Sequence, residues 1–444
     1  MRNWGRGHSF VIIVILLYTI FMLDIKFIRE NKDIVQAGAK KKRAEIDIDA
    51  LIALDDTRLK ELKEVEELRR EVNRVSNDIA RDQDSALKIQ LIEEMRSVKE
   101  EIKIKEEKLK ATMEEWQKIM LQVPNAPDIS VPEGATDAEN QEIKVWGEKP
   151  VFDFEMKDQL TLMSKLDLAD FERGVKVSGF RGYFLKNEGA LLSFALWQFF
   201  LDSLVEKGFT PMIVPSLVRK QTLMGTGYIP GGEDDLYKNQ DGDYFAGTGE
   251  VATMSYYANE VLDKTKFPIK FVSFSSCFRR EAGSHGKDIK GFFRVHEFYK
   301  LEQIVLCEAN HEESVKLHEE ITKNVEDLLI ALNLPYHIVV NCGGDLGLGQ
   351  VKKYDIEIWS PSQNKYRETH SSSYFHDFQT RRLNIKYKDL DGKLKYAHSL
   401  NNTAIATPRI IEAIVENCQQ ADGSIKIPEV LRKYMGGKEF IKQL

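Results

Sequence analysis

The 444-residue sequence has few cysteines and no paired cysteine motif. Its four cysteines are scattered, with no CxxC pair and no cysteine–histidine cluster: Cys277, Cys307, Cys342 and Cys418. This spacing excludes a disulfide framework and a structural zinc site, and it indicates a reducing compartment. We expect all four to be small, buried side chains.

The sequence also lacks a Walker phosphate-binding loop. Its glycine-rich stretch, NCGGDLGLGQ, contains Gly349, but Gln350 follows where that motif requires Lys and then Ser or Thr. We interpret these glycines as a turn before the strand YDIEIW. A Ser-His-Asp or Cys-His signature of covalent catalysis is absent as well.

An excess of positive charge is missing too. Lys and Arg total 63 and Asp and Glu total 70, for a formal net charge of −7. This balance argues against indiscriminate coating of nucleic acid, although a local basic surface is compatible with it. The length exceeds the usual size of a single hydrophobic core and predicts two domains.

One uncharged apolar run, FVIIVILLYTIFML, lies at residues 10–23 behind Arg2 and Arg6. It is shorter than the roughly 20 residues of a membrane span. It has the length of a signal-peptide core, but no small-x-small cleavage site follows it. From the residues alone, three interpretations stay open: a signal peptide, a signal anchor, or a misassigned start.

Residues 47–121 are charged, nearly free of Gly and Pro, and periodic. Apolar residues at spacings of three and four form a narrow seam, which predicts coiled-coil helices. The segment ARDQDSA interrupts the seam, so we expect two helices folded back as an antiparallel hairpin. The seam residues are Leu59, Leu62, Val65, Leu68, Val72, Val75 and Ile79, then Leu91, Met95, Val98, Ile102, Leu109, Met113, Trp116 and Met120.

A hairpin of this kind serves either partner helices and oligomerisation or nucleic-acid binding. Its basic side chains can contact phosphates, or they can form the solvated half of Glu–Lys pairs. After Pro124 and Pro127 we expect a linker into a second domain. The basic residues are Lys60, Lys63, Arg69, Arg70, Arg74, Arg96, Lys99 and Lys103.

The stretch from Phe271 to Glu302 reads as a strand, a polar loop and a second strand. Because residues two apart in a strand share a face, one face would carry arginines, an aromatic ring and carboxylates. A solvated hairpin with cross-strand ion pairs is the simplest explanation. The grouped residues are Cys277, Arg279 and Glu281, and then Arg294, His296, Phe298, Lys300 and Glu302.

This stretch, with FRREAG before the loop and FFRVHEF after it, resembles motif 2 of class II aminoacyl-tRNA synthetases, in the version of the seryl-tRNA synthetases. Other segments resemble that family in the same order. They are a helix and strand ending at Pro215 (motif 1), Thr248-Gly249-Glu250 where the family usually has Thr-Ala-Glu, the segment YRETHSSSYFHDFQTRR, HSLNNTAIATPRIIEAIVENCQQ (motif 3) and IKIPEVLRKYMGG. The resemblance covers nearly the whole chain from Met22.

The resemblance implies an α+β fold, in which an antiparallel coiled-coil helical hairpin precedes a class II antiparallel β-sheet core flanked by helices. It implies a tRNA-binding arm at residues 22–123, a linker at 124–145 and a catalytic domain at 146–444. Because such proteins open with a phrase like MLDIKFIREN, we expect Met22 to be the start. Residues 1–21 are then a translated upstream extension or a signal-like segment, and the enzyme is cytoplasmic.

The implied activity is that of a serine–tRNA ligase. Such an enzyme activates L-serine with ATP and Mg²⁺ to seryl-adenylate, and it transfers serine to the 3′ end of tRNA(Ser). The tRNA for selenocysteine is an open second acceptor. Family members are homodimers whose arm grips tRNA held by the other subunit, and no membrane partner is expected. Two rival readings are a ligase that charges a carrier protein and a membrane-tethered protein with a degenerate synthetase body.

The resemblance also assigns site residues. Arg279 and Arg409 are the expected catalytic residues, and Glu368 with Ser371 would bind the metal. The serine-binding set is Thr248, Gly249, Glu250, Arg279, Glu302, Asn401 and Thr403. The ATP-binding set is Arg279, Arg280, Glu281, Arg294, Val295, Phe298, Glu368, Thr369, His370, Ser371 and Arg409.

Overall fold

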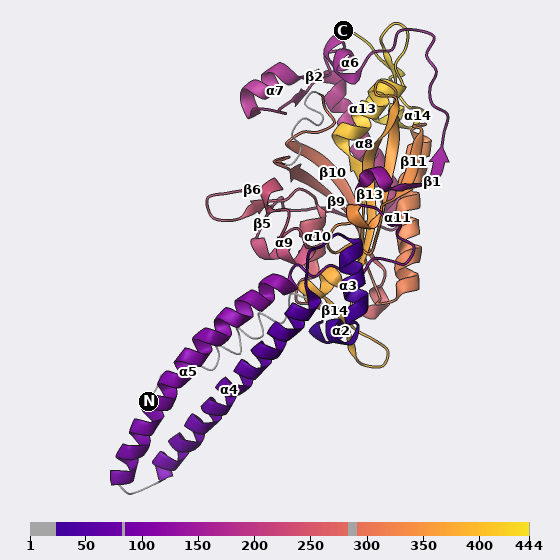
Figure 1. Ribbon diagram of the computed structural model, residues 1–444. Helices are drawn as coiled ribbons and strands as arrows, with labels where there is room; N and C mark the ends of the chain where they lie inside the picture. The colour runs from indigo at the N-terminus through magenta and orange to yellow at the C-terminus, as the bar shows by residue number, and fades with distance from the viewer. Residues whose placement is uncertain (1–23, 82–84, 283–290, 444) are drawn as a thin grey trace. The chain divides into compact units, whose positions relative to one another are not determined.

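The computed structural model describes residues 24–81, 85–282 and 291–443 (Figure 1). These residues form two compact units. The first comprises residues 24–40 and 44–124, and the second comprises 41–43 and 125–443. The apolar run at residues 10–23, and with it our expectation for residues 1–21, lies outside the described residues.

The first unit is helical. Its two long helices lie side by side and run in opposite directions (Figure 1). Residues early in the first helix contact residues late in the second: Arg58 lies over the ring of Trp116 at 4.5 Å, whereas Arg69 pairs with Glu106 at 2.5 Å. The predicted antiparallel hairpin is therefore confirmed. The helices are α2 (Ile25–Glu30), α3 (Lys32–Lys41), α4 (Ile48–Arg81) and α5 (Ser85–Met120).

The second unit is built on one large sheet. Within the described residues it has eight strands in the order β1-β11-β12-β13-β16-β10-β9-β4, and every pairing is antiparallel except β9 with β4. This confirms the predicted fold class. The strands are β1 (Gln141–Trp146), β4 (Thr210–Ile213), β9 (Ile269–Phe278), β10 (Glu297–Cys307), β11 (Tyr336–Val340), β12 (Lys352–Ser360), β13 (Lys365–His376) and β16 (His398–Ala406).

Three longer helices cover one face of this sheet: α8 (Asn187–Glu206), α11 (His311–Ala331) and α13 (Thr407–Asn417). Gln303 of β10 and Asn402 of β16 each donate a hydrogen bond to the carbonyl of Ile321 in α11. Because strand side chains alternate, their sequence neighbours face the other side. That side remains open for a binding site.

The remaining elements are short and surround the main sheet. Additional helices are α6 (Gln159–Lys165), α7 (Phe171–Ser178), α9 (Lys220–Thr226), α10 (Glu250–Met254), α12 (Phe378–Arg382) and α14 (Glu429–Arg432). Additional strands are β2 (Ala169–Asp170), β3 (Phe184–Leu185), β5 (Leu217–Val218), β6 (Tyr237–Lys238), β7 (Tyr244–Phe245), β8 (Val261–Leu262), β14 (Lys386–Lys388), β15 (Leu394–Tyr396), β17 (Ile425–Lys426) and β18 (Phe440–Ile441).

Residues 125–145, nearly all of the predicted linker, belong to the second unit. The side-chain amide of Asn125 donates to the carbonyls of Gly349 (3.2 Å) and Phe375 (2.8 Å). Its last residues belong to β1, which pairs with β11 at the edge of the main sheet. The stretch that the prolines mark as a linker therefore includes an edge strand.

The two predicted strands are present as β9 and β10, and most of the predicted loop between them, residues 283–290, lies outside the described residues. One detail of the sequence interpretation is wrong. His296 does not join the face of Phe298 and Glu302, because it precedes the first residue of β10 and the alternation of side chains does not extend to it. Its imidazole instead lies 2.6 Å from the hydroxyl of Tyr237.

All four cysteines are free; three are buried, as predicted, and Cys418 is partly exposed. Among the described residues, α8 is the one helix long and apolar enough to span a membrane. It also passes as an ordinary core helix, because Leu192, Leu196, Phe200 and Leu204 along it are fully buried in the main hydrophobic core.

Candidate active site

A cavity of about 380 Å³ opens on the face of the sheet opposite α11. Its floor comes from β10, β13 and β16, and its rim includes the start of α13 and the loops at 226–228 and 347–350. It contains most of the predicted site residues: Glu250, Arg279, Glu281, Arg294, Val295, Phe298, Glu302, Glu368, Thr369, Ser371, Asn401, Thr403 and Arg409. Thr248, Gly249, Arg280 and His370 do not line it.

Arg279 is held at the end of β9 by its own backbone and side chain. Its amide donates to the carbonyl of His296 at 2.9 Å, and its Nε donates to the carbonyl of Gly247 at 3.3 Å. The guanidinium lies 5.4 Å from the centre of the Phe298 ring. A guanidinium beside an aromatic ring can bind the two parts of a nucleotide, because the cation attracts a phosphate and the ring can stack on a flat base.

Arg280, the next residue, points elsewhere. Its guanidinium donates to the carbonyl of Asp234 at 3.1 Å and is exposed outside the cavity. The backbone conformation then changes at Glu281, whose φ is 56°. The carboxylate of Glu281 forms an ion pair with Arg294 and lies 3.7 Å from Arg181. Glu281 and Arg294 are thus neighbours in the cavity, with Val295 buried beside them.

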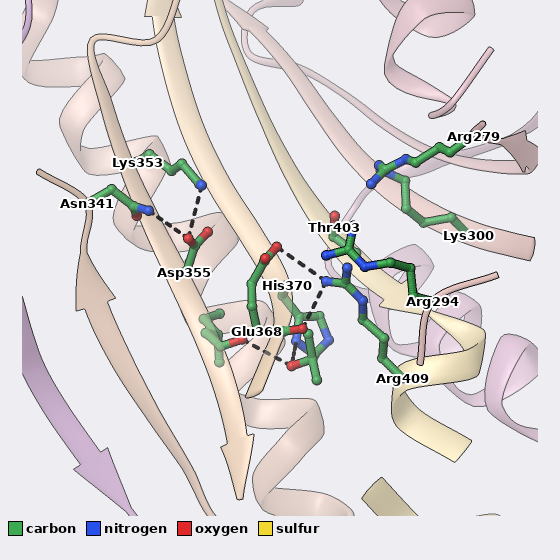
Figure 2. Close-up of polar contacts among 12 residues, drawn as sticks. Arg279, Arg294, Lys300, Asn341, Lys353, Asp355, Glu368, His370, Thr403 and Arg409 are labelled. Carbon is green, nitrogen blue, oxygen red and sulfur yellow. Dashed lines mark hydrogen bonds and ion pairs between the residues drawn. The ribbon is translucent and has the colours of Figure 1, made fainter. Parts of the chain in front are cut away.

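Arg409 and Glu368 form the second charged group of the cavity (Figure 2). Pro408 lies in the first turn of α13, where proline is tolerated, and Arg409 follows it near the helix start. The Arg409 guanidinium donates to the Glu368 carbonyl at 2.9 Å and lies 3.3 Å from its carboxylate. The guanidinium also lies over the ring of Phe293, 4.8 Å from the ring centre.

Glu368 carries a stable negative charge. Burial raises the pKa of a carboxyl group, but the charges of Arg409, Lys353 and Arg279 outweigh that effect and hold the pKa of Glu368 at about 2. Asp355 behind it shows the opposite shift. Burial and the charge of Glu368 raise its pKa to about 6, although Lys353 lies only 3.0 Å away.

Ser371 faces the cavity from β13, directly opposite Asp355 on β12. His370 points away from it and is almost completely buried. Thr369 donates to the carbonyl of Ile356 at 3.0 Å and lies 2.8 Å from Nδ1 of His370. Burial, followed by the charge of Arg409, lowers the pKa of His370 to about 3, so this imidazole is neutral. It does not line the cavity, although the resemblance counts it among the ATP-binding residues.

Glu302 and Thr403 face each other across β10 and β16. The Thr403 hydroxyl lies 3.4 Å from the Glu302 carboxylate, and Lys300 forms an ion pair with the same carboxylate. All three side chains are buried at the cavity wall. Asn401 lies two residues before Thr403 on the same strand face. This group presents polar atoms that a small hydroxylated ligand could reach.

Glu250 lies at the start of α10 with both carboxylate oxygens hydrogen-bonded. Tyr228 donates to one at 2.8 Å and Gln379 donates to the other at 2.6 Å. Burial and the charge of Glu302 raise the pKa of Glu250. Thr248 is buried and accepts from the Glu250 amide at 3.3 Å. Its hydroxyl therefore supports the turn, as a Thr two residues before a helix often does.

Gly249 leaves room for two serine side chains. A Cβ at this position would lie 2.9 Å from the hydroxyl oxygens of both Ser273 and Ser275. The absence of a side chain at Gly249 therefore allows Ser273 and Ser275 of β9 to approach its backbone.

Sequence reasoning did not assign Tyr228, Gln379 or Lys300 to the site. Tyr228 and Gln379 lie 22 and 129 residues from Glu250, and no motif connects them to it. For Lys300 the sequence does contain a signal, because the alternation of side chains along β10 places Lys300 on the same face as Glu302.

Comparison with known proteins agrees with this geometry. The model of the seryl-tRNA synthetase N-terminal domain matches residues 22–127, and that of the tRNA synthetase class II core domain (G, H, P, S and T) matches residues 236–418. The chain is 45% identical over 425 residues to the serine–tRNA ligase of Deinococcus radiodurans, covering 95% of this chain and 99% of that protein.

Solved structures give the same result. Seryl-tRNA synthetase from Pyrococcus horikoshii complexed with ATP matches with a TM-score of 0.86 and 39% identity, covering 95% of this chain and all of that one. The cytoplasmic serine–tRNA ligase of Naegleria fowleri in complex with AMP matches with a TM-score of 0.81 and 31% identity, covering 95% and 99%. The chain therefore belongs to the seryl-tRNA synthetase family, as its motifs predict.

Proposed function

We propose that the protein joins serine to tRNA in two steps within this cavity. A carboxylate oxygen of serine attacks the α-phosphorus of ATP and displaces pyrophosphate, giving seryl-adenylate. A ribose hydroxyl at the 3′ end of tRNA then attacks the acyl carbon, and AMP leaves. Neither step requires a side-chain nucleophile. The observation that carries the proposal is a single cavity lined by three arginines together with a buried hydroxyl-reading pair, Glu302 and Thr403.

The arginines would bind ATP and stabilise the charge that develops in the first step. Arg279 would contact the α-phosphate and the serine carboxylate, Arg294 the outer phosphates, and Arg409 the phosphates at the start of α13. Because Arg294 is paired with Glu281, ATP would replace one ion pair by another. Positioned cations in a partly desolvated cavity are commonly the largest contribution to catalysis of this type.

The adenine would lie between the Phe298 ring and the Arg409 guanidinium. Both line the cavity, and Arg409 already lies over one aromatic ring, that of Phe293. Glu281 would accept a hydrogen bond from the adenine amino group, beside Val295. Arg280 and His370 take no part in this arrangement, because neither lines the cavity.

Glu368 and Ser371 would hold Mg²⁺. They offer a carboxylate and a hydroxyl, the hard oxygen donors that Mg²⁺ prefers, and the low pKa of Glu368 keeps that carboxylate charged. The residues thus fit the ion. When bound, Mg²⁺ neutralises charge on the phosphates of ATP. Arg409, whose guanidinium lies 3.3 Å from the Glu368 carboxylate, would help to orient it.

Serine would be recognised at both of its ends. Glu250 would accept from the α-ammonium group, and Glu302 and Thr403 would bind the side-chain hydroxyl near Asn401. A buried pair that bonds a hydroxyl is left unsatisfied when alanine enters, which disfavours alanine by as much as ~10⁴. Threonine would be excluded because its extra methyl group lacks room.

The helical hairpin would bind tRNA(Ser). Several of its basic side chains are exposed, including Lys63, Arg70 and Arg74, and phosphate contacts are made by such groups. We also propose a cytoplasmic homodimer joined through α8 and β4. Exposed apolar side chains on these elements support the interface: Leu191, Phe194, Val205 and Ile213.

Amino-acid-dependent exchange of pyrophosphate into ATP tests this function. The assay compares serine, threonine, alanine and glycine as the only amino acid. Exchange with serine alone is expected. Exchange with alanine or glycine instead would favour the ligase that charges a carrier protein. No exchange from the folded protein would support the degenerate, non-catalytic reading.

A further inference from the structure

Lys42 is a buried lysine that the proposed reaction does not use. It lies in the segment Lys41–Arg43, which belongs to the second unit, whereas residues 24–40 and 44–124 belong to the first. Its Nζ donates to the carbonyls of Gly347 (3.0 Å), Leu348 (2.9 Å) and Gln350 (2.5 Å). An ammonium group has three N–H donors, and here each has an acceptor.

This burial is energetically demanding. Across residues 24–81, 85–282 and 291–443, no carboxylate forms an ion pair with Lys42, and burial lowers its pKa well below the ordinary value. A buried charge is tolerated when its donors are satisfied. The three carbonyls meet that requirement, so the side chain and the loop that carries them fix each other in place.

The loop at residues 347–350 forms one wall of the cavity. Asn125 makes two further hydrogen bonds to the loop. Its backbone amide donates to the carbonyl of Leu348 at 2.9 Å, and its side-chain amide donates to the carbonyl of Gly349 at 3.2 Å. The Gln350 side chain donates to Ser373 at 2.8 Å. Every carbonyl of the loop therefore accepts a hydrogen bond from Lys42 or Asn125.

Close packing shows that the Lys42 segment is fitted to this region. A Cβ on Gly343 would lie 2.4 Å from the carbonyl of Lys41, so only glycine allows the segment to approach. Similarly, a Cβ on Gly349 would lie 2.5 Å from the ring of Phe378.

The loop adjoins the residues that would bind serine. Ser373, bonded to Gln350, is the cross-strand partner of Asn401. Phe378, against Gly349, also packs within 3.0 Å of the position of a Cβ on Gly227, the residue before Tyr228. Tyr228 in turn donates to Glu250. A shift of the loop would thus disturb the serine side of the cavity first.

We propose that Lys42 is a positioning residue for serine binding, acting as an internal cation that fixes the backbone of residues 347–350 as a wall of the serine pocket. This inference rests on the proposed function, because it assigns that wall to serine.

Lys42→Met tests the proposal, since methionine keeps most of the side-chain volume and removes the three donors. In pyrophosphate exchange, the KM for serine should rise about tenfold or more, because small displacements of a binding wall are costly. The KM for ATP should change by less than about threefold, because the contacts of the loop lead to Asn401 and Glu250 on the serine side. Lys207→Met is the matched control: that lysine bonds to Asn324 and Asp327 outside the cavity, and both KM values should remain unchanged.

Chemical rescue distinguishes loss of the Lys42 ammonium group from a general defect in folding. Lys42→Ala removes three carbons and the amine, which propylammonium replaces. Propylammonium chloride should lower the serine KM of this variant, whereas sodium chloride at equal ionic strength should not. If Lys42→Met does not fold, Asn125→Ala serves as the second variant, because it removes a different bond to the same loop and should also raise the serine KM selectively.

The outcomes separate the two claims. Serine-dependent exchange by the unchanged protein, with an unaltered serine KM in folded Lys42→Met, would overturn the role of Lys42 alone. Equal increases in the serine and ATP KM values, with no rescue by propylammonium, would also overturn the positioning role. Lys42 would then have a general structural role only. Absence of serine-dependent exchange in the unchanged protein would instead overturn the proposed function.

Discussion

The helical hairpin and the sheet unit use charged residues in different ways. In the hairpin, ion pairs such as Arg69–Glu106 and Lys105–Glu64 are partly exposed, and pairs of this kind contribute about 0–1 kcal/mol each. In the cavity, Glu302, Glu250 and Lys300 are removed from water and depend on specific partners. An exposed basic side chain can leave its carboxylate partner and bind a polyanion at little cost in free energy. Buried charged side chains have fixed positions and can therefore select one small ligand.

This contrast predicts that single substitutions affect serine activation strongly when they lie in the cavity. The largest effect is expected for Arg279→Ala, which should reduce pyrophosphate exchange by ~10³ or more, because it removes a positioned cation from the reacting phosphate. Arg280→Ala is the control, since its guanidinium lies outside the cavity. Similar losses in both variants would contradict the assignment of Arg279.

A smaller effect is expected at the hydroxyl-reading pair. Thr403→Val keeps the shape of the side chain and removes the hydroxyl that faces Glu302. The preference for serine over alanine should fall by roughly 10- to 100-fold, since one hydrogen-bonding partner is lost. The ratio of kcat/KM for the two amino acids in exchange measures it. An unchanged ratio would remove Thr403 from the serine pocket.

Much of this contrast could be predicted from the sequence. The apolar seam predicted the hairpin because a helix pair depends on local periodicity, and Val65 and Leu109 are indeed buried in it. Most residues of the site in the sheet unit could be predicted because each lies in a short sequence motif. Tyr228, Gln379 and Lys42 were not predictable, because their contacts depend on tertiary packing between segments far apart in the chain. The position of His296 was predicted incorrectly because the strand alternation was extended beyond the start of β10.

Acid should destabilise the sheet unit through its buried histidines. Burial lowers the pKa of His318 to about 4, from an ordinary value near 6.5. Between these values the unfolded chain binds more protons, so stability falls as the pH decreases through that range, by about 2 kcal/mol at pH 5 for this residue. Thermal unfolding from pH 7 to pH 5 measures the loss, and His318→Asn should reduce it.

The histidine with the opposite environment provides the control. Burial lowers the pKa of His337, but its bonds to Glu357 and Glu142 outweigh this and raise it. His337→Asn should therefore increase the acid sensitivity of unfolding. If both variants shifted the pH dependence in the same direction, burial would not be its cause.

The last effect, on stability, is expected at Gly249. Gly249→Ala places a methyl group 2.9 Å from the hydroxyls of Ser273 and Ser275, and it should cost about 1–3 kcal/mol of unfolding free energy. Adding Ser273→Ala and Ser275→Ala should restore most of that loss. A fully stable single variant, measured by chemical denaturation, would show that the glycine is not required by its neighbours.

The assignment of tRNA binding to the hairpin and of serine activation to the sheet unit can be tested in one protein. Because Arg69 and Glu106 face each other, residue 68 can be joined to residue 107 by a short Gly-Ser turn, which shortens the hairpin and keeps its base. We predict that this variant retains serine-dependent pyrophosphate exchange and loses aminoacylation of tRNA(Ser). Normal charging of tRNA(Ser) by the shortened protein would contradict the account.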